Sequence, residues 1–401
     1  MPTLESATYR FNPGLELVVF DRLEPALQSS LASLTRDPSF YGVILRADRH
    51  GDRRAAATAK AVDRESALLL LTLRTPGQIP AYARRLLGAD AANTITGLVL
   101  DGVLEIEFAG EFRSGPDAIG AMGVEGYDGA IDGVDDAPRG RIAQLSIGAL
   151  RHAAMLPIDD VAVLAARLYR YNSLPLAPAG DAAGGATRTP TTDLARLGLA
   201  TAAVAAALDR DWTCTASGAD GDWLCWSAGE RWESTDGTRG TCKLYVSPSP
   251  LAIRDAFAAT VAAATSHHAM AFKAGAGPYG LLRPDKLVVY FRQRDHLYAA
   301  AAALSDALAG APAQGVPFTA GITADGMLSW AADPPAHVVS DSWRSWLTTQ
   351  LAAALLAART ADPDSPARPD PVRFALQRAA ALRIDPRTWA PADTMWQPST
   401  T

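Results

Sequence analysis

Three segments in the second half of the chain place apolar residues at every second position, and this pattern constrains the fold more than any other feature. The segments are CKLYVS at 242–247, AMAFKAG at 269–275 and DKLVVYFR at 285–292. Because successive side chains of a strand point to opposite faces of a sheet, each segment predicts a strand with one apolar face. The other face would carry lysine, tyrosine and arginine.

The pattern from residue 241 onward predicts the element order β-α-β-β-α-β-β-α. We expect strands at 242–247, 268–274, 285–292, 317–323 and 326–331. Helices are expected at 250–265, 295–309 and 341–358. This order favours an α+β domain with a largely antiparallel sheet.

Lysine is scarce in this chain, and three of its four lysines lie in the predicted strands. They are Lys243, Lys273 and Lys286, whereas arginine supplies the remaining 33 of the 37 basic residues. A lysine that persists against such a bias suggests a task that arginine cannot perform. Arginine does not deprotonate in proteins, while the pKa of lysine shifts readily. The sequence therefore predicts proton abstraction in this half of the chain.

The same region is positively charged in an otherwise acidic protein. The whole chain has a formal net charge of −6, yet residues 239–294 contain eight Lys or Arg and only two acids, Asp255 and Asp285. Clustered cations repel one another unless an anion joins them, and phosphate suits such a group. The alternative is a set of solvated charges on the outer face of a sheet. The scarcity of lysine and the tyrosines of the strands favour a phosphate site.

Composition disfavours several other classes of protein. The 401 residues are 48% hydrophobic and 20% charged, which predicts a globular, soluble chain of about two or three domains. The negative net charge argues against general nucleic-acid binding. Cysteine and histidine lack metal-ligand spacing, and neither GxxxxGKS/T nor a placed GxGxxG occurs, so we expect no metal and no cofactor. The three cysteines lack CxxC spacing, no signal-peptide pattern is visible, and no apolar run is long enough to cross a bilayer. We therefore expect a cytoplasmic protein without a membrane span.

Two breaks divide the chain into a front region, bridging helices, a linker, a second domain and a tail. Residues 176–192 are rich in Ala, Gly, Pro and Thr and predict the linker. The proline-rich tail surrounds one short helix, at 371–382, and is expected to lie over the surface or to be partly mobile. The predicted units are 1–140, 141–175, 176–192, 193–360 and 361–401, with bridging helices at 142–155 and 159–171 and an apolar helix at 194–208. Short strands with core and loop packing are expected around Trp212, Trp223, Trp226 and Trp232.

The front region has the element order of a winged helix. A strand at 41–47 precedes three helices, the first capped by Asp63, the second at 79–87 and the third capped by Asn93. A hairpin at 103–108 and 110–114 would form the wing. The order is similar to leader-peptide recognition domains of peptide-modifying enzymes, in which the leader adds as a strand beside the sheet. A purely structural domain is the alternative, and few basic residues at 79–107 disfavour DNA binding.

The strand motifs resemble a known family. They are KLYVS, AFKAG and RPDKLVVYF, together with GVPFTAGI at 315–322, GMLSWAADPP at 326–335 and SWRSW at 342–346. In this order they resemble the phosphothreonine lyase superfamily, whose founding members are type III secretion effectors that eliminate phosphate from host kinases. They are more similar still to the effector-like lyase proteins of class V lanthipeptide and thioviridamide-type biosynthesis clusters. The resemblance begins near residue 151 and includes LAARLYRYNSLPL at 164–176.

The resemblance implies a cofactor-free β-elimination of phosphate from a ribosomally made precursor peptide, which leaves dehydroalanine or dehydrobutyrine. The implied partners are the phosphorylated precursor and a Ser/Thr peptide kinase, with a cyclase as a further candidate. By position, Lys273 would be the base, and Lys243 would polarise the substrate carbonyl and stabilise the enolate. Burial and neighbouring cations would lower the pKa of Lys273. The implied phosphate ligands are Arg283, Lys286 or Arg292, and Tyr290. Arg344 and His268 are further candidate site residues.

One departure from the family concerns the general acid. The secreted effectors have a histidine two residues after the first lysine, where this chain has Tyr245. A phenol donates a proton less readily at neutral pH, so phosphate could instead leave unprotonated, neutralised by Arg and Lys. His267 and His268 are other candidates, although adjacent strand positions would point them apart. The departure keeps open a second function, that of a catalytically silent phosphopeptide-binding partner in a peptide-modifying complex.

Overall fold

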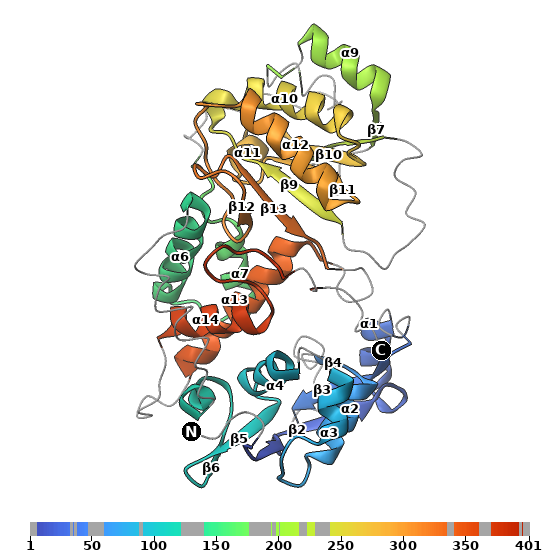
Figure 1. Ribbon diagram of the computed structural model, residues 1–401, viewed down its shortest axis with the longest axis vertical. Coiled ribbons are helices and arrows are strands. Elements are labelled where there is room, and N and C mark those ends of the chain that lie inside the picture. Colours follow the sequence, from blue (N-terminus) through green and yellow to red (C-terminus); the bar gives the residue numbers. More distant parts are fainter. Residues whose placement is uncertain are drawn as a thin grey trace.

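The computed structural model describes most of the chain and shows an elongated molecule (Figure 1). The predicted linker at 176–192 and Trp232 lie outside the described residues. Within the described part, no helix combines the length and the apolar character that a bilayer crossing requires. The described residues are 6–32, 35, 38–46, 60–87, 91–121, 140–175, 194, 198–199, 201–215, 223–228, 241–334, 341–360, 370–392 and 395.

A seven-stranded sheet organises the second half of the chain, and all its neighbouring strands pair antiparallel. Its order is β12-β13-β9-β11-β10-β8-β7. The predicted mixture of helices with an antiparallel sheet is thus confirmed, although the strand expected at 317–323 contains only two residues. The strands are β7 (Thr213–Thr215), β8 (Trp223–Ser227), β9 (Cys242–Val246), β10 (Ala271–Gly275), β11 (Leu287–Phe291), β12 (Ala320–Gly321) and β13 (Leu328–Ala332).

The two faces of this sheet pack against different helices. Leu244, Phe272 and Val289 share a buried cluster with α10 (Ile253–Ser266) and α12 (Arg294–Ala307), as the alternation predicts. The opposite face contributes Tyr245 and Val288 to a second cluster. That cluster includes α7 (Val161–Tyr169) and α13 (Trp343–Thr360). The short elements η7 (Pro250–Ala252), α9 (Ala202–Asp211) and α11 (Gly277–Leu282) complete this part of the fold.

The second cluster continues from the sheet through the bridging helices into the front region. It contains residues of α6 (Gly140–Met155), which the sequence predicts, and of α14 (Pro371–Ala381). It also contains the apolar residues of β1 (Tyr9–Phe11) and β5 (Leu104–Phe108). The front region therefore shares a continuous apolar core with the helices beneath the large sheet.

The front region holds the predicted three helices and hairpin. β1 pairs with β5, which pairs with β6 (Glu111–Arg113). Asp63 caps the first helix as predicted, because its side chain accepts a 2.6 Å hydrogen bond from the Ser66 amide. The cap predicted at Asn93 is wrong, since α4 already begins at Ala91. The other elements are β2 (Leu15–Val19), η1 (Phe20–Arg22), α1 (Pro25–Leu31), β3 (Phe40–Arg46), β4 (Lys60–Asp63), α2 (Arg64–Thr72), α3 (Ala81–Leu87), α4 (Ala91–Leu100) and η5 (Gly115–Ala121).

The prediction that the tail lies over the surface is wrong for its described residues. Phe374 of α14 and Trp389 beyond it are fully buried, and the Trp389 ring meets that of Phe318 at 5.2 Å between centroids. The prolines do not keep this segment out of the core, because Pro371 occupies the first turn of α14, where a missing amide costs nothing.

Candidate active site

Two lysines, two aromatic rings and one arginine form a continuous row on the sheet face opposite α10 and α12. Tyr290 lies between the lysines, with its ring centroid 5.1 Å from Lys243 Nζ and 5.9 Å from Lys273 Nζ. The ring centroid of Trp223 lies 4.0 Å from Lys273 Nζ and 4.6 Å from Arg283 Cζ. Strands β9, β11, β10 and β8 are neighbours, so their pairing sets this order. We call these five residues the cationic row.

Lys243 is not an unmatched cation. Its Nζ lies 2.5 Å from Asp333 Oδ2, and the lysine is only 6% exposed. The other carboxylate oxygen of Asp333 accepts a 2.9 Å hydrogen bond from the Trp343 amide at the start of α13. Asp333 follows β13, which pairs with β9. The charge count over residues 239–294 did not include this acid, because Asp333 is far from Lys243 in the sequence and reaches it only through strand pairing.

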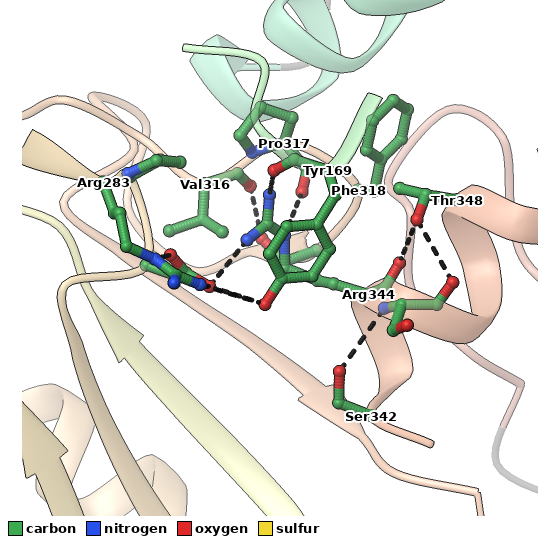
Figure 2. Close-up of polar contacts among 12 residues, drawn as sticks. Tyr169, Arg283, Val316, Pro317, Phe318, Ser342, Arg344 and Thr348 are labelled. Carbon is green, nitrogen blue, oxygen red and sulfur yellow. Dashed lines mark hydrogen bonds and ion pairs between the residues drawn. The ribbon is translucent and has the colours of Figure 1, made fainter. Parts of the chain in front are cut away.

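A second carboxylate, that of the buried Asp285, pairs with two arginines. Arg283 Nε donates to Oδ1 at 2.9 Å, and Arg344 Nη1 lies 2.8 Å from Oδ2. The Tyr169 hydroxyl donates to the same Oδ2 at 3.0 Å. Figure 2 shows the side chains of Arg283, Tyr169 and Arg344 gathered together. Burial alone would raise the pKa of Asp285, but Arg344 and Arg283 together hold it well below its usual value.

Arg344 belongs to the framework of the site. Only 1% of it is exposed, and its Nη2 donates to the Tyr169 carbonyl at 2.6 Å (Figure 2). Its Nε donates to the Pro317 carbonyl at 3.3 Å. These bonds join α7 to the first turn of α13, so Arg344 holds the elements around Asp285 in place.

Lys273 is the lysine of the cationic row that lacks an acidic partner. Among the described residues, no carboxylate lies within 4 Å of its Nζ, and the side chain is half-buried. Burial first and the charge of Lys243 second lower the pKa of Lys273 to about 8. Arg283 also contributes to this lowering of the pKa, while Asp285 opposes it. Near neutral pH, an appreciable fraction of Lys273 is therefore an unprotonated amine.

Two residues of β8 belong to this site and were not predicted to do so. Trp223 was expected only to pack in the core or loops, yet it lies beneath Lys273 and Arg283. Cys225 pairs directly with Lys273 across β8 and β10. The sequence WLCWS could have indicated this, because it alternates like a strand. Leu224 and Trp226 are buried on one face, which places Trp223 and Cys225 on the other.

Tyr245, the candidate general acid, is buried beneath the sheet. It pairs across the neighbouring strands with Val288 and Ser329. Burial raises the pKa of Tyr245 well above its ordinary value. A phenol in this setting is a weaker proton donor than a free tyrosine, which works against the predicted acid role.

Lys286, Arg292 and His268 lie outside the cationic row. Lys286 is fully buried, donates to the Pro248 carbonyl at 2.6 Å and also to Gln314 Oε1. Burial lowers its pKa to about 7. Arg292 is exposed at the end of β11, where its Nε contacts Met270 Sδ at 3.2 Å. The His268 ring lies beside His296 of α12, and His267 is the C-terminal cap of α10.

A cleft of about 890 Å³ opens beside Arg283. Its walls come from α7, α11 and the beginning of α13, and Tyr169 and Asp285 also line it. Among the described residues, no cluster of three or more His, Cys, Asp or Glu is arranged to hold a metal ion. The site thus consists of amines, guanidinium groups, carboxylates and aromatic rings next to an open cleft.

Comparisons with known proteins find similarity at the level of solved structures. No family model matches the chain, and no curated protein matches it. An effector protein from Pseudomonas syringae pv. tomato strain DC3000 aligns with a TM-score of 0.44 and 12% identity, covering 63% of this chain and 99% of that one. An effector protein from Pseudomonas syringae pv. syringae strain 61 aligns with a TM-score of 0.38 and 11% identity, with the same coverage.

Proposed function

We propose that this protein is a phosphoserine/phosphothreonine lyase that forms dehydroalanine or dehydrobutyrine in a ribosomally made precursor peptide, after a kinase has phosphorylated it. The observation that carries the proposal is the setting of Lys273. It is a half-buried lysine without an acidic partner among the described residues. It lies in the same row as Lys243 and Arg283, and its pKa is lowered to about 8. The motifs of the strands support the same reaction through their resemblance to phosphothreonine lyases.

In the proposed reaction, the unprotonated Lys273 Nζ takes the proton from the substrate Cα. The electrons of the Cα–H bond form the Cα=Cβ double bond, and the Cβ–O bond breaks. Phosphate departs with the electron pair of the Cβ–O bond, and the proton remains on Lys273. Lys243, ion-paired with Asp333, supplies a fixed positive charge that can polarise the substrate carbonyl as negative charge develops there.

Arg283 and Tyr290 are the proposed phosphate ligands, because both belong to the cationic row. A phosphate bound at Arg283 would share this guanidinium with Asp285, whose charge is also balanced by Arg344. The proposal assigns Lys286 to holding the loop at Pro248 and Gln314. We further propose that phosphate leaves as an anion neutralised by the row, because burial makes Tyr245 a poor proton donor.

The test uses a synthetic phosphothreonine peptide and purified protein without added metal, with a partner kinase in a second tube. Mass spectrometry should detect loss of phosphoric acid, and an added thiol should trap the alkene. Lys273→Ala should abolish both signals, while Lys60→Ala, which changes a partly exposed lysine of the front region, should keep them. Turnover retained by Lys273→Ala would remove this lysine from the base role.

A second function is favoured by one observation, the burial of Tyr245 in place of an acid. In that case the protein would bind a phosphopeptide and present it to another enzyme. Peptide binding without loss of phosphoric acid in either tube would establish this function over the lyase.

We also propose that the front region recognises the leader of the precursor peptide. The support is the order β1-β5-β6, which leaves β6 at the edge of its three-stranded sheet. An extended leader could pair with such an edge strand through main-chain hydrogen bonds.

A further inference from the structure

The cleft beside Arg283 has a built polar wall that the proposed reaction does not use. Arg170, Ser173 and Ser345 line it. Their side chains make no hydrogen bond or ion pair with any other residue in the described parts of the chain. Hydroxyl groups both donate and accept hydrogen bonds, and a guanidinium donates several. These groups suit the amide and carbonyl groups of a bound main chain.

Other lining residues are small or apolar. α7 presents Ala162 and Ala166, both exposed, and α11 presents Tyr279, which is 78% exposed. An exposed tyrosine at a cleft can offer a large aromatic contact to a bound peptide, and tyrosine is enriched among the residues that dominate binding. The lining includes the acidic Asp341 as well as the basic Arg170, so the cleft does not select strongly for a charged ligand.

The cleft and the proposed base are joined by one short segment. α11 connects β10, which carries Lys273, to Arg283. It packs back on β10 at two glycines, where a Cβ added to Gly275 would lie 2.3 Å from the Gly280 carbonyl oxygen. This contact holds the backbone of α11 directly against β10, the strand that carries Lys273. Arg283 lines the cleft and stacks on the same Trp223 ring as Lys273, so a phosphate at Arg283 lies where the two sites meet.

We propose that this cleft binds the residues flanking the phosphorylated Ser or Thr, as an extended and mostly uncharged peptide segment. The proposal rests on the proposed function, since it places the rest of the substrate next to the reacting side chain. It makes the α7–α11–α13 surface a determinant of which peptides are used.

The test fills the cleft and compares two probes. One is a phosphothreonine peptide with several uncharged residues on each side, and the other is N-acetyl phosphothreonine methylamide, which has no flanks. Ala166→Trp narrows the cleft, whereas Val163→Trp places the same ring on an exposed position of α7 that does not line it. Tyr279→Ala removes the exposed aromatic without disturbing the core.

Binding is measured in a Lys273→Ala background by isothermal titration calorimetry, so that no turnover is required. Ala166→Trp and Tyr279→Ala should weaken binding of the long peptide by about tenfold, the order expected when a few contacts are lost. Both variants should leave the flank-free probe unchanged, and Val163→Trp should change neither. Equal effects on both probes, or none on either, would overturn the proposal.

The same set separates this proposal from the proposed function. In parallel, mass spectrometry measures elimination by the same variants made in the protein that retains Lys273. Selective loss of long-peptide binding without elimination by any variant would reject the lyase and retain the cleft. Elimination of the long peptide at an unchanged kcat/KM in Ala166→Trp would reject the cleft and retain the lyase.

Discussion

At the scale of residues, the two lysines of the cationic row differ in their acidic partners rather than in their chemistry. Lys243 has Asp333, and Lys273 has none among the described residues. The alternation of the strands predicted that Lys243, Lys273 and Tyr290 share a face. It could not predict Asp333, because that contact depends on pairing between strands separated by many residues.

The pH dependence of elimination follows from this difference. Lys273 must be unprotonated to act as a base, so kcat/KM should rise with pH through about 8 and then level off. Lys243→Gln removes the second-largest cause of the lowered pKa, after burial. The rising limb should therefore move to higher pH, with a lower plateau.

Rate profiles against pH check this expectation, with Lys60→Gln as the control. A limb that stays at the same pH in Lys243→Gln would show that Lys243 does not tune the base.

At the scale of elements, the hydrophobic pattern found the strands that carry the site but not the segment that joins them. α11 occupies GPYGLL between two predicted strands, and its glycines and proline favour a turn in a sequence-based prediction. What makes it a helix is tertiary: its backbone lies directly on β10 at Gly275 and Gly280.

Gly275→Ala should push α11 away from β10. The added Cβ would lie 2.3 Å from a backbone oxygen, so we expect a loss of about 1–3 kcal/mol in the free energy of unfolding, as in other overpacked sites. Gly97→Ala is the matched control, because a Cβ there meets nothing within 4 Å and lies in α4. Urea unfolding of both variants provides the measurement, and equal stabilities would contradict the close packing.

At the scale of the whole molecule, one apolar core crosses the unit boundaries that composition predicts. It runs from the front region through α6 and α7 to α13 and α14. Proline-rich composition predicted a surface tail, but composition does not report where the apolar residues between the prolines pack. Removing residues 1–140 would uncover this core, so leader binding has to be tested in the intact chain.

Trp389→Ala should show that the tail stabilises the fold. Removal of a fully buried tryptophan is expected to cost about 3–5 kcal/mol of unfolding free energy. Met155→Ala, at a position 76% exposed, should cost little. Thermal or denaturant unfolding measures the stability of both variants. Equal stability of Trp389→Ala and Met155→Ala would show that the tail does not stabilise the core.

Leader recognition can be tested in the intact chain by amide hydrogen exchange. The full-length precursor should slow exchange in β6, because an added strand would protect its edge amides. A short core phosphopeptide should leave β6 unchanged. Equal exchange with both peptides would contradict leader binding at this edge.

The stacking of Lys273 and Arg283 on one indole also gives the molecule an intrinsic optical probe. Indole emission responds to nearby charge, so the Trp223 signal should change when Lys273 loses its proton and again when an anion draws Arg283 toward it. The difference between the fluorescence of the native protein and of Trp223→Phe would therefore follow occupancy of the site in real time, without a label on either partner.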